Sequence, residues 1–244
     1  MTAPGCPGPA TCPVPSPSTV HLRQLRTVGL EAGPGYHTSS QARYWPGLFN
    51  TSGRGDSRFS PFTISGKVIP TVYGACSQTV ALLETVFHDV HASVGSRLIT
   101  HMDLVGRNLV DFGLSERLVL YDLTDDALGR LDLQRDQLVS TTAAHYPCTR
   151  EWAEALHARK GPGGSRPVGL LWNSRVAELA KGDSPLLADL LPGRPEEVFM
   201  LFGDKLTTID PGDYSTEQRY DALASTAALP LITAIAEQLG ATLA

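Results

Sequence analysis

Apolar runs alternate with polar, glycine-rich stretches along this chain, and the pattern predicts strands and helices in mixed order. The short continuous apolar runs at Val168–Trp172 and Val198–Phe202 are typical of strands buried on both faces. Four further β-prone stretches predict strands at Tyr36–Arg43, Val68–Ala75, Leu98–Leu104 and Arg117–Leu123. The predicted strands are therefore short segments spread along the chain from residue 36 to residue 202.

Helices are predicted between these strands. Ser77 is a favourable helix N-cap, and Gly95 is placed to end the helix that it starts. Apolar residues recur between them at helical spacing, at Leu83, Val86, Phe87, Val90 and Val94. Further helices are predicted over 150–159 and from about residue 216 onward. Because strands and helices interleave, the pattern predicts one mixed α and β domain.

The first 20 residues differ from the rest, because they hold six prolines and no charged side chain. Such a composition favours an extended or disordered segment. We therefore expect a Pro/Gly-rich leader over 1–35, poorly ordered at its start, and the main domain over 36–210. A C-terminal helical extension packed on the domain is expected over 211–244. Within the leader, Val20–Leu30 is compatible with either a short helix or a strand.

Composition narrows the function classes. The 244 residues are 42% hydrophobic and 18% charged, as in an ordinary globular protein. A net charge of −5 argues against a general nucleic-acid-binding surface and leaves room for one local basic pocket. No apolar run reaches the roughly 18 residues of a membrane helix, and no secretory signal is recognisable. The predicted location is the cytoplasm.

The four cysteines and seven histidines show no metal-binding spacing. There is no CxxC pair and no HExxH element, so isolated thiols and no metal site are predicted.

Three segments of the chain carry candidates for chemistry. Arg58, in a Gly/Ser-rich loop, is suited to bind a phosphate; the alternative is a structural arginine paired with Asp56 or a carbonyl. Glu84 lies beside the apolar face of the predicted helix, half-buried with a partner or at the solvent edge, and Tyr73 ends the preceding strand. Ser174 follows a buried strand, where it either binds a ligand or caps the next helix.

The order of these motifs resembles the RES domain family, which takes its name from its Arg, Glu and Ser. The matching segments are Arg58–Pro61, Pro70–Tyr73, Ala81–Glu84, Tyr146–Ala153 and Gly169–Ser174. The resemblance spans about residues 36–210. It implies an α+β fold similar to that of ADP-ribosyltransferases, with a mixed β-sheet core flanked by helices.

The resemblance also implies an activity and site roles. Such proteins cleave the nicotinamide–ribose bond of NAD⁺, as NAD⁺ phosphorylases or glycohydrolases, and act as toxins of toxin–antitoxin pairs. Glu84 would be the catalytic carboxylate, Arg58 would hold a phosphate, and Tyr73 would pack against nicotinamide or ribose. Ser174 would bind the nucleotide. NAD⁺ is then the substrate and inorganic phosphate a candidate co-substrate, with no cofactor.

One departure from the family concerns substrate binding. Many members open with Tyr-Arg where this chain has Tyr36-His37. The role of that arginine passes to His37 or Arg43, or is lost.

The expected partner is an antitoxin, usually a helical DNA-binding repressor. The expected assembly is a hetero-oligomer with it or a homo-oligomer, with no direct contact to nucleic acid or membrane. Two alternatives stay open: a mono-ADP-ribosyltransferase acting on a macromolecule, and a non-enzymatic nucleotide-binding module.

Overall fold

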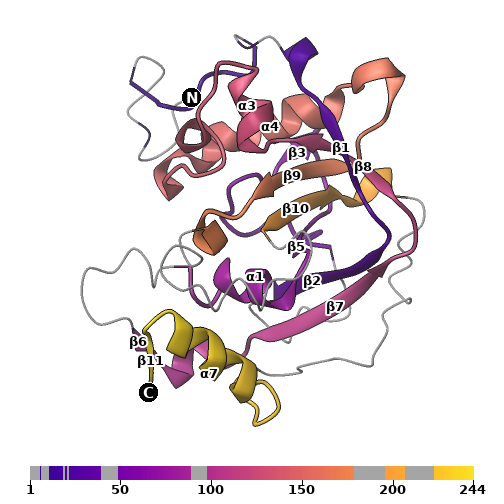
Figure 1. The fold of residues 1–244 in the computed structure, drawn as a ribbon. Helices are drawn as coiled ribbons and strands as arrows, with labels where there is room; N and C mark the ends of the chain where they lie inside the picture. The colour runs from indigo at the N-terminus through magenta and orange to yellow at the C-terminus, as the bar shows by residue number, and fades with distance from the viewer. Residues whose placement is uncertain are drawn as a thin grey trace.

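A seven-stranded mixed β-sheet forms the centre of the molecule (Figure 1). The computed structural model describes residues 6, 11–18, 20, 22–39, 49–88, 98–178, 196–206 and 223–244. The strand order is β1-β8-β9-β10-β5-β2-β7. The bounds are β1 Thr27–Leu30, β2 Gly33–Ser39, β5 Thr71–Ala75, β7 Asn108–Leu114, β8 Leu118–Asp122, β9 Gly169–Asn173 and β10 Glu197–Phe202. β8 and β9 are parallel, and the other neighbours are antiparallel.

Helices and two small strand pairs surround this sheet. The α-helices are α1 Gln78–Leu83, α2 His101–Leu104, α3 Asp125–Gly129, α4 Tyr146–Ala158 and α7 Leu229–Gln238. Short 3₁₀ turns are η1 Leu22–Gln24, η3 Arg135–Gln137, η4 Ala143–His145, η5 Pro162–Gly164 and η6 Gly203–Lys205. The small pairs join β3 Thr63–Ile64 to β4 Lys67–Val68, and β6 Leu98–Ile99 to β11 Thr242–Leu243. The expected α+β class is confirmed.

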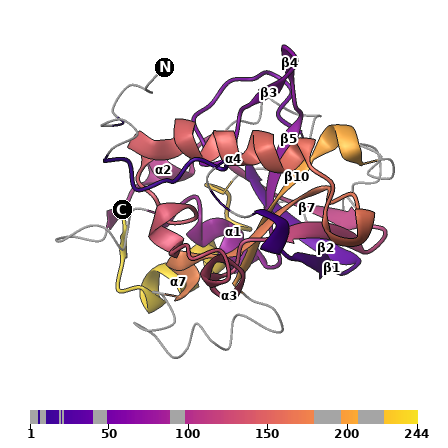
Figure 2. The same ribbon diagram turned by 90° about the horizontal axis from the view of Figure 1, so that it is seen from above.

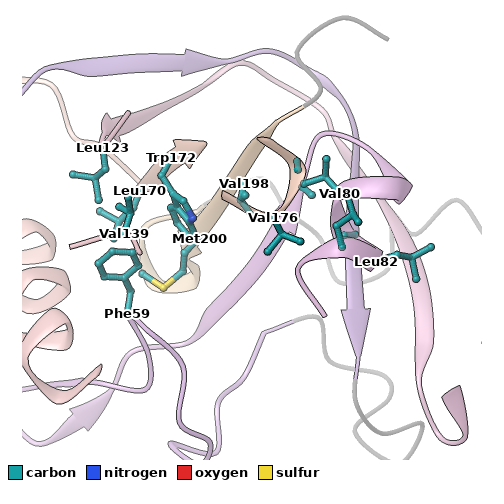
Figure 3. Close-up of a cluster of buried hydrophobic side chains, with 14 of the residues drawn as sticks. Phe59, Val80, Leu82, Leu123, Val139, Leu170, Trp172, Val176, Val198 and Met200 are labelled. Atoms are coloured by element: carbon teal, nitrogen blue, oxygen red, sulfur yellow. The ribbon is translucent and has the colours of Figure 1, made fainter. Parts of the chain in front are cut away.

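The apolar run of β10 is buried on both faces of the sheet. Val198, Met200 and Phe202 point into a large core shared with the helices. Phe199 and Leu201, at the alternate positions, belong to a second core on the other face. Figure 3 shows the first core, where Met200 lies beside Phe59 and Trp172. Burial on both faces explains why this strand lacks an apolar–polar alternation.

The helix predicted from Ser77 to Gly95 is shorter than expected, because residues 84–88 are not helical. The Ser77 hydroxyl accepts a hydrogen bond from Val80 N at 3.1 Å, as expected of an N-cap, but α1 ends at Leu83. The Thr85 hydroxyl then donates to the carbonyl of Ala81 at 2.7 Å and competes with the helical pattern. Residues 89–97 lie outside the described part of the chain. The spaced apolar residues at 86 and 87 are buried without being helical.

Two other local expectations also need correction. The strand predicted at Leu98–Leu104 is β6 followed by the helical turn α2, which begins where the Asp103 carboxylate accepts hydrogen bonds from Thr100. Strand β7 was not predicted, although it pairs with β2 over seven residues. Its sequence includes Asp111 and Gly113, which weaken the strand pattern.

The folded part of the chain starts earlier than the expected boundary at residue 36. β1 pairs with β8 from Thr27 to Leu30 and follows the 3₁₀ turn η1, so Val20–Leu30 contains both of the elements that the sequence left open, a short helix and a strand. Within the expected leader, Val14 is buried in the main core and Pro15 O accepts a hydrogen bond from Trp152 Nε1 at 2.8 Å. The described part of the leader therefore packs against α4.

Toward the C-terminus, α7 packs its apolar face on the domain. Ile232 and Ile235 are fully buried in the main core. Residues 207–222 lie outside the described part. Among the helices that the structure describes, each is too short or insufficiently apolar to cross a lipid bilayer.

We expect Gly74→Ala to destabilise the fold. A Cβ at Gly74 would lie 2.5 Å from the Phe199 ring and 3.0 Å from that of Phe112, so the two rings must shift. Overpacking of this kind costs about 1–3 kcal/mol of unfolding free energy. Urea denaturation measures the unfolding free energy of the variant. Gly113→Ala is the control, because nothing lies within 4 Å of a Cβ at that position. Equal stability of the two variants would contradict the packing.

Candidate functional site

The position of β10 between β5 and β9 brings two separate chain segments to one edge of the sheet. β10 runs antiparallel to both, so β5 and β9 are parallel to each other. Ala75, the last residue of β5, pairs with Val198, and Asn173, the last of β9, pairs with Glu197. The residues that follow both strands therefore emerge side by side.

Glu84 and Ser174 meet at this edge. Ser174 Oγ donates a hydrogen bond to Glu84 Oε1 at 2.5 Å and accepts one from Ala177 N at 3.0 Å. Ser174 thus caps the helical residues 175–178 and also holds the Glu84 carboxylate. The Ser174 side chain has no exposed surface, so it lies behind Glu84 and orients it. The expected contact between Ser174 and a nucleotide stays a prediction.

Arg58 is a half-buried guanidinium held by neutral groups. Its Nη1 donates to Thr141 O at 2.9 Å and to Thr141 Oγ1 at 3.1 Å, and its Cζ lies 5.2 Å from the centre of the Tyr146 ring. Asp56 pairs instead with Arg150, at 2.8 Å. Within the described residues, no carboxylate lies within 4.0 Å of Arg58.

The surroundings of Arg58 shift its pKa in both directions. Burial lowers the pKa of Arg58 from its ordinary value, while Tyr146 and Glu84 act in the opposite direction. The nearby charge of Arg175, an exposed residue directly after Ser174, lowers this pKa further. A guanidinium remains charged at neutral pH, so two positive charges lie near Glu84. Such a site favours an anionic ligand.

Tyr73 fixes the loop that carries Arg58. Its hydroxyl oxygen accepts a hydrogen bond from Phe59 N at 2.9 Å and is hydrogen-bonded to Ser60. Its ring packs edge-on against Trp172, with ring centres 6.1 Å apart. Burial raises the pKa of Tyr73 to about 12, so the hydroxyl keeps its proton at neutral pH. In the protein without ligand, this side chain acts as an anchor for the loop.

The start of α4 completes the support of Arg58. The Thr149 hydroxyl donates a hydrogen bond to Arg58 O, and Tyr146 contributes the ring beneath the guanidinium. The roles of Thr141, Tyr146 and Thr149 were not predicted from sequence. They lie more than 80 residues from Arg58, and only the family-like helix start at Tyr146–Ala153 pointed to this region.

The remaining expected site residues are described only in part. Tyr36 lies in β2, where its backbone pairs with Ala75 and Asp111, and His37 pairs with Val110. β2 therefore adjoins the strand that leads into α1. Arg43 lies outside the described residues.

Two other features lie near this site. A surface pocket lined by Pro61, Phe62, Arg150 and Glu154, among others, contains neither Arg58 nor Glu84. The thiols of Cys6, Cys12 and Cys148, expected to be isolated, gather around His145. That expectation is wrong, because the N-terminal segment reaches the start of α4 only in the folded chain.

Comparison with known proteins gives one family. A model described as the RES domain matches residues 27–187, a stretch that contains Arg58, Tyr73, Glu84 and Ser174. A solved structure, the crystal structure of the M. tuberculosis MbcT-MbcA toxin-antitoxin complex, is 15% identical with a TM-score of 0.44. The match covers 73% of this chain and 76% of that chain. The curated proteins give no match.

Tyr73→Phe is expected to lower the unfolding free energy by about 1 kcal/mol near neutral pH, because Phe59 N loses its acceptor. The pH dependence gives a second readout. With the pKa of Tyr73 raised to about 12, the wild type should lose stability above about pH 10, where the unfolded tyrosine ionises first. Urea denaturation from pH 7 to 11 should show that the difference in unfolding free energy between the wild type and Tyr73→Phe becomes smaller as the pH rises. A constant difference would contradict a buried neutral hydroxyl.

Proposed function

The chain belongs to the RES domain family, and we propose that it consumes NAD⁺ by cleaving the bond between nicotinamide and ribose. The observation that carries the proposal is the Glu84 carboxylate, held by the buried Ser174 hydroxyl near the Arg58 guanidinium. These are the residues expected to act on NAD⁺ in this family.

The chemistry suits a fixed carboxylate. As the nicotinamide–ribose bond breaks, positive charge builds on the ribose and the bond electrons leave with neutral nicotinamide. An oriented carboxylate stabilises that charge. Ser174 binds Oε1 of Glu84, whereas Oε2 has no hydrogen-bond partner in the part of the protein that is described. Oε2 is the oxygen that we assign to the ribose.

The guanidinium suits the anionic part of the substrate. Thr141 holds Nη1 of Arg58, while Nε and Nη2 donate no hydrogen bond to any described residue. Those N–H groups can therefore donate to a phosphate of NAD⁺ or to an acceptor phosphate. With water as acceptor the products are ADP-ribose, nicotinamide and a proton. With inorganic phosphate they are ADP-ribose 1″-phosphate and nicotinamide.

We further propose that the activity is toxic in the cytoplasm and is restrained by a protein partner. Consumption of NAD⁺ removes a cofactor of central metabolism. Cysteines that form no disulfide suit a reducing compartment. The family membership supports an antitoxin that covers the site, for which a helical DNA-binding protein is the expected type.

Glu84→Gln should reduce nicotinamide release from NAD⁺ by at least about 100-fold, because the amide cannot supply negative charge to the ribose. Purified protein is incubated with labelled NAD⁺, with and without phosphate, and nicotinamide is quantified. Glu151→Gln, an exposed residue of α4, is the matched control and should keep full activity. Undiminished release by Glu84→Gln would refute the role of the carboxylate. Label transferred to protein or nucleic acid would indicate a macromolecular ADP-ribosyltransferase, and binding without release would indicate a non-enzymatic module.

Expression of the wild type in bacteria should deplete NAD⁺ and arrest growth, whereas Glu84→Gln should do neither. Co-expression of the reading frame adjacent to its gene should restore both. Cell NAD⁺ content and colony counts measure the outcome. Growth arrest without NAD⁺ loss would contradict the proposed activity, and failure of the adjacent product to restore growth would contradict the proposed antitoxin.

A further inference from the structure

Three thiols and one imidazole converge where the N-terminal segment meets the start of α4. Cys12 Sγ lies 3.4 Å from His145 Nδ1 and 3.7 Å from Cys148 Sγ. Cys148 Sγ lies 3.6 Å from Cys6 Sγ. All four candidate ligand atoms lie within 4.8 Å of one another, and all four residues are partly buried. Cys6 and Cys148, two members of this group, are 142 residues apart in the sequence.

These separations match a tetrahedral metal centre. With Zn–S bonds of about 2.3 Å and a Zn–N bond of about 2.0 Å, tetrahedral angles place two sulfurs about 3.8 Å apart and a sulfur and nitrogen about 3.5 Å apart. The observed S···S separations of 3.6 and 3.7 Å and the S···N separation of 3.4 Å agree with that geometry. None of these cysteines is joined in a disulfide in the structure.

We propose that Cys6, Cys12, His145 and Cys148 bind one Zn²⁺ ion. Three thiolates and one imidazole are a preferred zinc ligand set, because soft sulfur ligands suit this ion. Binding replaces three thiol protons, which leave to solvent, and involves no change of oxidation state. Four protein ligands close the coordination shell, so the site is structural and has no position for substrate.

The local charges also suit a cation. Cys148 lies in the first turn of α4, where the helix N-terminus favours a thiolate. A divalent ion between the sulfurs supplies the positive charge that stabilises their deprotonated forms.

The proposed site connects the N-terminal segment to the support of Arg58. In the sequence, Tyr146 lies between His145 and Cys148, and its ring centre is 5.2 Å from Arg58 Cζ. Thr149, the next residue, donates to Arg58 O. On the other side, Cys12 leads into Val14, which is buried in the main core. The N-terminal segment lies beside α4, as Figure 2 shows, so a metal there would hold both in place.

The test measures metal directly and does not depend on catalytic activity. Full-length protein is produced in zinc-supplemented medium, purified under reducing conditions without chelator, and analysed by elemental mass spectrometry. We expect one zinc per chain in the wild type and in Cys76→Ser, whose thiol lies instead 3.7 Å from Glu197 Oε2. Cys12→Ser and Cys148→Ser should lose zinc affinity by more than about 100-fold, since even changes around a metal ligand cost 10–100-fold.

A second measurement needs no substitution. Wild-type apoprotein is titrated with Co²⁺, which should give the visible absorption bands of tetrahedral thiolate coordination and be displaced by one equivalent of Zn²⁺. Chelator should lower the Tm of the wild type and leave that of Cys12→Ser unchanged. The proposal is overturned if the reduced wild type binds no more zinc than Cys12→Ser, or if Cys76→Ser loses zinc equally. A stable disulfide among the three cysteines with no metal in the reduced protein would overturn it as well.

Discussion

The buried hydrogen bond from Ser174 to Glu84 is the contact on which the candidate site depends. A carboxylate near the protein interior needs a donor, and Ser174 supplies one while its own backbone ends β9 and starts a helix. The two residues meet because β10 runs antiparallel between β5 and β9, so that both of these strands end at one edge. Displacing β10 would therefore separate the carboxylate from its donor.

Arg58 depends on contacts from three separate parts of the chain. Tyr73 in β5 accepts a hydrogen bond from Phe59, the residue after Arg58, and Thr141 accepts one from the guanidinium. The ring of Tyr146, in the first turn of α4, packs against the guanidinium. All of these groups are neutral, so the positive charge is oriented without being neutralised by them. This arrangement suits a binding site better than a structural salt bridge, since an internal carboxylate would compete with an anionic substrate. The proposed zinc site acts on the same turn of α4.

Motif order predicted much of the site. Arg58, Tyr73 and Glu84 were selected from short segments, and the structure brings Arg58 and Glu84 close enough for their charges to interact. For Ser174, the helix-cap alternative is realised, because its hydroxyl accepts from Ala177 N, and the same hydroxyl donates to Glu84. For Arg58, the carbonyl alternative is realised through Thr141 and the Asp56 alternative is not. Partners more than 80 residues away leave no periodic pattern in the sequence, so Thr141 and Tyr146 were missed.

The sequence by itself determined the mixed α and β class, the buried strands β9 and β10 and the N-cap of α1, because these follow from local apolar runs and local hydrogen bonds. Only the tertiary structure decided where the helix after Ser77 ends, where the folded chain begins, and which thiols meet. Those outcomes depend on competition between local and distant contacts. Cys6 and Cys148 show it most directly: neither residue has a metal-binding neighbour in sequence at zinc spacing, and packing of the N-terminal segment against α4 places their sulfurs 3.6 Å apart.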